Sequence, residues 1–258
     1  SNDDLKADIY VSWAIEQQNN AFATAYSGWK PPGVFLSKDE LQTAVNQWVS
    51  GRQWEAGRKK PHGHVRDWDT SRVTDMLNLF SSKKWFSQPL TWDTSRVTNM
   101  YGTFSDAEAF NQPLAWDTSR VTTMYRTFFR ANGFNSELVW DTSQVTNLQE
   151  TFWEAASFNT PLNWDTSKAK TMEGTFKEAD SFNQSAAISG WDVSSASTMN
   201  HMFYGTVLAS DACSKQEIHE AWKDFDAFLN AYIGWSAAVC TEPPPPSPSP
   251  ARPPPLPP

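Results

Sequence analysis

Two cysteines are the residues in this chain best placed to form a covalent cross-link. Cys213 and Cys240 are an even pair separated by 27 positions, which fits one disulfide. Two buried free thiols would give the same count. We predict the disulfide, because the proline-rich segment that follows Cys240 also indicates a location outside the cytosol.

A column of regularly spaced aspartates offers carboxylates that calcium could use. Each repeat supplies only one of them, whereas calcium takes roughly six to eight oxygen ligands. We therefore interpret them as turn residues, which accept hydrogen bonds from the backbone amides that follow. The aspartates are Asp69, Asp93, Asp117, Asp141, Asp165 and Asp192.

The histidines give little support for a metal or catalytic site. His62-Gly63-His64 follows three basic residues, and no cysteine or carboxylate spacing completes a metal site, so we predict a solvated loop. His201 and His219 have no acid–base partner that the sequence identifies. No phosphate loop, nucleophile elbow or carboxylate pair is present, and we predict no enzymatic activity, no metal and no cofactor.

The composition favours a folded protein that binds neither nucleic acid nor a membrane interior. Of 258 residues, 39% are hydrophobic and 14 are Trp, and the net charge is −8. This apolar content fills a sizeable core, whereas nucleic-acid binders carry a basic surplus. No apolar run approaches the ~18 residues that span a bilayer.

Internal repeats determine the architecture. A Trp-Asp pair recurs at intervals of 24, 24, 24, 24 and 27, and Phe86, Phe110, Phe134, Phe158 and Phe182 recur every 24 residues. The extra three residues fall in 186–190, which we interpret as an insertion in a turn. The first Trp of each pair is Trp68, Trp92, Trp116, Trp140, Trp164 and Trp191.

One repeat reads as strand, turn and helix. Pro113-Leu114-Ala115-Trp116 is short and half apolar, which predicts a strand, and Ser119 is a candidate helix N-cap. After it, apolar residues at spacings of 3, 4 and 3 (Val121, Met124, Phe128 and Ala131) predict an amphipathic helix. Such a unit cannot bury its apolar face alone, so six copies must stack into a solenoid.

Stacking turns the recurrent residues into ladders. We expect one wall of Trp, a second wall of Phe80, Phe104, Phe128, Phe152, Phe176 and Phe203, and a buried ladder of Asn111, Asn135, Asn159 and Asn183 that bonds neighbouring repeats. The sequon Asn183-Gln184-Ser185 falls in this ladder, which makes N-glycosylation doubtful. Thr70, Thr94, Thr118, Thr142 and Thr166 suggest an ice-binding array, but we expect the cap to occupy their hydroxyls locally.

Two phrases resemble a known family. Trp92-Asp93-Thr94-Ser95-Arg96-Val97-Thr98-Asn99-Met100 and Phe110-Asn111-Gln112-Pro113-Leu114 are similar to the BspA-like bacterial surface protein repeat, which is related to leucine-rich repeats and also occurs in surface proteins of microalgae and mycoplasmas. The resemblance covers roughly residues 61–210. It implies a right-handed α/β leucine-rich-repeat-like solenoid of about six 24-residue repeats at the cell surface. It implies no catalytic residues.

Both ends of a solenoid need covers. Residues 1–60 are predicted as an N-terminal helical cap, in which Ser37 to Glu40 forms a capping box and Leu36 and Leu41 a hydrophobic staple. Residues 211–240 are predicted as a C-terminal helical cap with the disulfide. There Ser214 to Glu217 repeats the box, and Ile218, Trp222, Phe225 and Leu229 face the core.

Residues 241–258 form a proline-rich tail, in which 11 of the 17 prolines occur. It is predicted as a polyproline II rod of about 50 Å, or else as a stiff linker or disordered tail. Its Ser-Pro steps resemble extensin-type hydroxyproline-rich glycoproteins, which implies O-linked sugars. Candidate positions are Pro243, Pro244, Pro245, Pro246, Ser247, Pro248, Ser249, Pro250, Pro253, Pro254, Pro255 and Pro257.

These features predict an extracellular structural glycoprotein in a surface fibre or cell-wall layer. The chain opens at Ser1 without Met, which we interpret as removal of a secretory signal or as trimming. We expect self-association, in which the tail of one molecule docks on Trp13, Trp29, Trp48 or Trp54 of the next. The alternative is a recognition module or adhesin that binds protein or glycan through the solenoid face.

Overall fold

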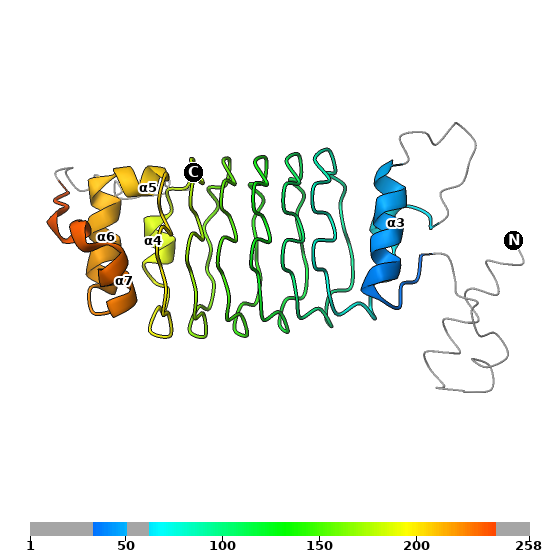
Figure 1. The fold of residues 1–258 in the computed structure, drawn as a ribbon, viewed down its shortest axis with the longest axis horizontal. Coiled ribbons are helices and arrows are strands. Elements are labelled where there is room, and N and C mark those ends of the chain that lie inside the picture. Colours follow the sequence, from blue (N-terminus) through cyan, green and yellow to red (C-terminus); the bar gives the residue numbers. More distant parts are fainter. Residues whose placement is uncertain (1–32, 51–61, 241–258) are drawn as a thin grey trace, which may run out of the picture.

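The computed structural model describes residues 33–50 and 62–240, which form an elongated stack of turns with helices at both ends (Figure 1). Helix α3 (Lys38–Ser50) covers one end, and the 3-10 helix η1 (Val65–Asp67) precedes the first repeat. The other end holds α4 (Ser185–Ile188), α5 (Val207–Ser210), α6 (Ala212–Trp222), α7 (Asp226–Ala231) and the 3-10 helix η2 (Ile233–Ala237). The chain is a solenoid-like repeat protein with few helices and little strand.

The repeats contain no α-helix between η1 and α4, so the predicted helix in each unit, and Ser119 as its N-cap, are wrong. Val121, Met124, Phe128 and Ala131 are buried as expected, but they lie in consecutive tight turns. The reason is a left-handed backbone at two positions four residues apart in each unit. In the third unit these are Arg126 and Arg130, both with a φ of 55°, which an α-helix does not allow.

The left-handed positions turn every second amide toward the next repeat. The N–H groups of Met100, Gly102, Phe104 and Asp106 donate to carbonyl oxygens 23 positions further along the chain, at 2.7–3.1 Å. Between them, the Thr103 and Ser105 amides donate three residues back within the same turn, and the Tyr101 amide donates to Asn99 Oδ1 at 2.9 Å. Backbone hydrogen bonding therefore runs both within and between repeats.

Single parallel bridges replace the predicted strands. They link Asp75, Asn99, Thr123, Asn147, Thr171 and Thr198 in succession. Pro113-Leu114-Ala115-Trp116, where we predicted the strand, is not a strand. The stacked Trp rings on that side are 6.1–6.4 Å apart, which exceeds the ~4.7–4.9 Å that paired strands require.

The predicted aromatic walls are present. Successive Trp rings from Trp68 to Trp191 stack within 11° of parallel. The wall from Phe80 to Phe203 has ring spacings of 5.3–6.1 Å. A further wall from Phe86 to Phe182 has spacings of 6.0–6.1 Å. The core is therefore continuous along the whole stack.

The N-terminal cover agrees with much of its prediction. In α3, Leu41 and Val45 are buried, and Ser37 Oγ accepts from the Glu40 amide at 3.3 Å as a capping box requires. The Glu40 carboxylate accepts from the Leu36 amide at 3.0 Å. Leu36 itself is 45% exposed, so the predicted hydrophobic staple is absent. Residues 1–32 and 51–61, which hold the rest of the predicted cap, lie outside the described part of the chain.

The C-terminal cover differs from its prediction in detail. Asp211, not Ser214, is the N-cap of α6, and its carboxylate accepts from the Ser214 amide at 2.6 Å. The helix ends at Trp222, and α7 starts afresh at Asp226. Because of this break, the predicted series of core-facing residues does not continue into α7. Phe228 is fully buried in place of Leu229, which is 38% exposed.

The three-residue insertion and the last repeat are closed by this cover. The insertion forms the single-turn helix α4, whose Ile188 is buried. The Tyr232 hydroxyl accepts from the Phe203 amide at 3.0 Å, in the place that a further repeat would occupy. Burial raises the pKa of the Tyr232 phenol, so this hydroxyl stays protonated.

Cys213 and Cys240 form a disulfide, as predicted. It joins the first turn of α6 to the end of the described chain, and the Cys240 amide donates to Gln216 Oε1 at 2.9 Å. The bond therefore closes a loop that contains most of α6 and all of α7 and η2.

We predict that Phe128→Ala lowers the free energy of unfolding by about 3–5 kcal/mol. Phe128 is fully buried, and its ring centroid lies 4.0–5.5 Å from those of Phe104, Phe134 and Phe152. The exposed residue Glu137 provides the control, because Glu137→Ala should cost under ~0.5 kcal/mol. Chemical denaturation measures both, and equal losses would contradict the proposed core.

We predict that Cys213→Ser combined with Cys240→Ser destabilises the C-terminal cover by about 3 kcal/mol, because the disulfide restricts the unfolded chain. Hydrogen exchange should show faster exchange in α6 and α7, while amides of the central repeats keep their protection. Uniform loss of protection along the solenoid would contradict a local role for the bond.

Candidate functional site

The recurrent aspartates lie in turns along one edge of the solenoid. Oδ1 of Asp117 accepts from the Ser119 amide at 3.0 Å and from the Ser119 hydroxyl at 2.7 Å. The same pair of contacts occurs at Asp93 and Asp165. The turn prediction is therefore confirmed, and each such carboxylate is held in one orientation.

These contacts keep the carboxylates ionised. The hydroxyl of the following serine, and next its amide, lower the pKa of Asp117, Asp141, Asp165 and Asp192. Neighbouring repeats oppose this shift, since Asp117 and Asp165 raise the pKa of Asp141 between them. The column is a row of like charges at the interval of one repeat.

The threonine that follows each aspartate is buried rather than displayed. Thr70, Thr94, Thr118 and Thr142 are 0–2% exposed, and each hydroxyl donates to the Asp carbonyl oxygen of the next repeat at 2.8–2.9 Å. The expectation of local capping is wrong, because these hydroxyls bond between repeats. The same burial excludes this column as an ice-binding array.

A basic column runs beside the aspartates. It consists of the exposed residues three positions after the first five aspartates, namely Arg72, Arg96, Arg120, Gln144 and Lys168, of which all but Gln144 are basic. Within residues 33–50 and 62–240, none of the four cations has an ion pair within 4.0 Å. Lys168 Nζ donates to Gln144 Oε1 at 2.9 Å. We call the two columns together the Asp–Arg edge.

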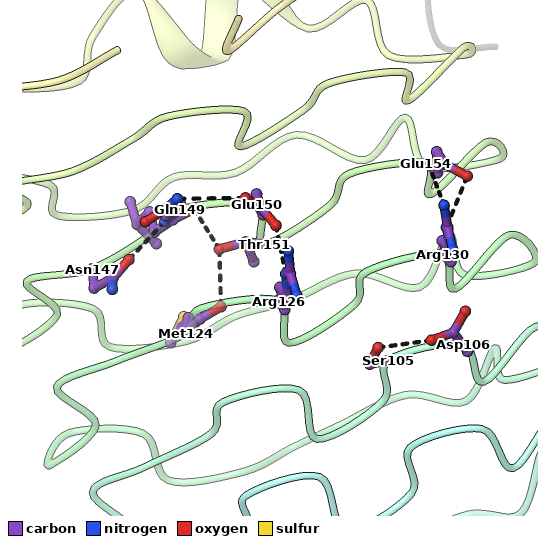
Figure 2. Close-up of polar contacts among 11 residues, drawn as sticks. Ser105, Asp106, Met124, Arg126, Arg130, Asn147, Gln149, Glu150, Thr151 and Glu154 are labelled. Carbon is purple, nitrogen blue, oxygen red and sulfur yellow. Dashed lines mark hydrogen bonds and ion pairs between the residues drawn. The ribbon is translucent and has the colours of Figure 1, made fainter. Parts of the chain in front are cut away.

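Two arginines elsewhere on the solenoid pair with a glutamate of the next repeat, as Figure 2 shows. Arg126 pairs with the buried Glu150, and Arg130 makes two bonds to Glu154 at 3.0 and 3.1 Å. The interval of 24 residues between each Arg and its Glu equals the repeat length, which is the sequence signal that predicts such pairs. We call these four residues the paired face.

Half-exposed rings and cations continue from the paired face. The Arg126 guanidinium lies 4.9 Å from the Phe129 ring centre, and Lys177 Nζ lies 3.9 Å from that of Trp153. The phenol of Tyr125 has a raised pKa, first through burial and then through Glu150. These rings are covered by neighbouring cations, so they contribute mainly to the solenoid itself.

The asparagine ladder bonds as predicted but lies at the surface. Oδ1 of Asn111, Asn135 and Asn159 accepts the amide of the next Asn at 2.8–2.9 Å. Asn111, Asn135 and Asn183 are exposed, so the prediction of burial is wrong. Burial therefore gives no reason to doubt modification of the Asn183 sequon.

The remaining predicted site residues are placed only in part. Trp48 packs edge-on against His64 and Phe86, whereas Trp13, Trp29 and Trp54 lie outside the described residues. So do all the tail prolines and serines. His64 is the N-cap of η1, and its side chain accepts from the Arg66 amide at 3.3 Å. Over the described ranges, no three His, Cys, Asp or Glu side chains cluster as metal ligands would.

Open grooves lie on the described part of the solenoid. One of about 380 Å³ beside α3 is lined by Trp48, Lys84, Trp85 and Phe86, and Trp85 is 75% exposed. Another, of about 590 Å³, lies between the third and fourth units and includes Trp116, Glu137 and the 82% exposed Val139. Among the helices that the structure describes, none has the length and apolar character for a membrane crossing.

We predict an acid limb of stability from the aspartate column. A carboxylate whose folded-state pKa is lowered stabilises the fold above its ordinary pKa of 3.8, and this contribution disappears as the pH falls below 3.8 through the lowered value. Replacing Asp117, Asp141, Asp165 and Asp192 with Asn keeps an acceptor and should flatten the fall. Asp180→Asn is the control, and denaturation between pH 5 and about 2 measures the difference.

The comparisons with known proteins give one family. A model described as "Mycoplasma protein of unknown function, DUF285" matches residues 52–139 and 138–232 in two tandem copies. No curated protein and no solved structure matches the chain. Since the two copies cover more than half of its residues, the chain belongs to the DUF285 family.

Proposed function

We propose that the protein is a non-enzymatic, extracellular structural glycoprotein. In this proposal the capped solenoid is a stiff bead, and the proline-rich tail is a glycosylated connector in a surface fibre or cell-wall layer. The solenoid is right-handed and related to leucine-rich repeats, as the resemblance to BspA-like surface repeats implies.

The observation that carries this proposal is the unbroken bonding between repeats. Backbone bridges run from Asp75 to Thr198, and ring stacks run beside them from Trp68 to Trp191. Helices cover both ends, and a disulfide closes one cover. Such a unit resists bending and local opening, which suits a spacer in a surface layer.

The groove beside α3 supports docking of the tail. Its lining includes Trp48 and the exposed Trp85, and polyproline rods bind aromatic grooves with little loss of conformational entropy. A tail that docks on the next molecule makes a heterologous contact, which propagates a filament. Sugars on the prolines would cover its outside.

A recognition module is the second candidate, and the groove at Val139 favours it. The 82% exposed Val139 and the exposed Pro113 and Ala115 give this part of the solenoid an apolar surface. Here the tail is a plain stalk, and the solenoid binds a protein or glycan.

Mass spectrometry of the native protein separates the two candidates. The structural glycoprotein predicts a series of pentose or hexose mass increments and added oxygen atoms on residues 243–258. It also predicts that filaments fail to form when this segment is deleted. A bare tail, or filaments that persist without it, would contradict the proposal. Trp85→Ala tests the groove beside α3 and should weaken the filaments. Glu137→Ala, at an exposed residue outside that groove, is the control and should leave them unchanged.

A further inference from the structure

We propose that the Asp–Arg edge is a self-association surface that pairs two solenoids side by side, in parallel and in register. The partner is a second copy of this chain. This inference goes beyond the proposed function, because it needs neither the tail, nor sugars, nor export.

The first step is that the charges of both columns, all exposed except the half-buried Asp69, form no ion pair within the described part of the molecule. Each Asp is fixed on its serine through Oδ1, so it does not rotate to bind the neighbouring cation. The cations on the edge have no ion pair within the described ranges, whereas Lys84, Arg126 and Arg130 all pair with a Glu in the next repeat. The edge thus differs from the paired face, although Lys83, Lys170 and Lys177 of the described solenoid also make no ion pair.

The second step is that like charges recur at one-repeat spacing. Arg72, Arg96 and Arg120 occupy three consecutive units, and carboxylates line the column beside them. Like charges at neighbouring positions are destabilising by themselves. Opposite charges of a partner remove this cost on both columns together.

The third step is symmetry. A two-fold axis parallel to the solenoid places the acidic column of each copy over the basic column of the other, repeat against repeat. An axis at right angles to the solenoid, within the contact, places like charges together. A pair of parallel columns of opposite sign is therefore self-complementary in only one of these arrangements, which is an isologous dimer.

Charge also selects this partner over a charged polymer. A polyanion that binds the cations meets a carboxylate three positions before each one, and Arg120 lies close enough to Asp117 to lower its pKa. A polycation meets the reverse problem. Only a surface with both signs at the same interval satisfies both columns.

Exposed ion pairs are weak, so the contact depends on number and on salt. Sedimentation equilibrium of the full chain should show dimers at about 0.01 M salt, where the Debye length is roughly 30 Å, and monomers at about 1 M, where it is roughly 3 Å. Deletion of residues 243–258 should leave this dimer unchanged, which separates it from filament formation through the tail.

Charge variants test the columns directly. Arg96→Gln with Arg120→Gln removes four pairs from a symmetric dimer and should weaken association at least about tenfold. Gln already stands at position 144 of the same column, so these variants keep a tolerated residue. Gln144→Arg should strengthen association. Lys38→Gln with Lys215→Gln removes the same charge from α3 and α6, and should have no effect.

A cysteine tests the orientation. Ser143 falls between Asp141 and Gln144 in the chain and is half-buried, so in the proposed dimer Ser143→Cys should form a disulfide-linked dimer at low salt, whereas the exposed Ser157→Cys should not. A monomer at every salt concentration, an equal response to both charge variants, or binding of dextran sulfate in place of self-association would overturn the proposal.

Discussion

The fold depends on each repeat supplying hydrogen-bond partners to the next. Left-handed residues such as Arg126 and Arg130 turn alternate amides along the solenoid axis, where only a neighbouring repeat offers carbonyl oxygens. A buried amide without a partner costs roughly as much as a lost hydrogen bond. One unit therefore does not fold alone, and the ends require covers of another kind. Tyr232 at one end and Gln42, which donates to the Leu79 carbonyl at 2.9 Å, at the other are such covers.

The thickness of an aromatic ring stack imposes a second condition. The Trp and Phe86 walls are spaced by 6.0–6.4 Å, too far for backbone pairing on their side of the solenoid. Side chains make the bonds there instead. The Trp140 indole donates to the Leu114 carbonyl at 3.0 Å, and Thr118 donates to the Asp141 carbonyl at 2.9 Å. This explains why Trp, Thr and Asn recur in most repeats although each carries a polar group into or beside the core.

The repeat interval made the ladders, the solenoid and the buried positions predictable, because a residue that recurs every 24 positions must stack on its equivalents. The backbone was not predictable in the same way. Spacings of three and four fit a helix as well as turns that reverse every four residues, and Arg126, Glu150 and Gly174 share a left-handed position that only the glycine suggests. At the C-terminal cover, Asp211 and Ser214 are both residue types that commonly cap a helix, so the sequence alone did not decide between them. In the structure Asp211 is the N-cap of α6.

The Asp–Arg edge and the paired face use their charges differently: one exposes them to solvent, and the other pairs them between repeats. On the paired face, Glu150 and Glu154 neutralise their arginines, so those charges contribute to the stack and present little to a partner. On the edge, each aspartate carboxylate accepts a hydrogen bond from the serine two positions later, and the neighbouring cation is exposed to solvent. A solenoid multiplies such a local choice, because whatever one turn leaves unpaired becomes a row along the whole molecule. Weak single contacts then act together at a fixed interval, which is the property that a surface layer of repeated beads requires.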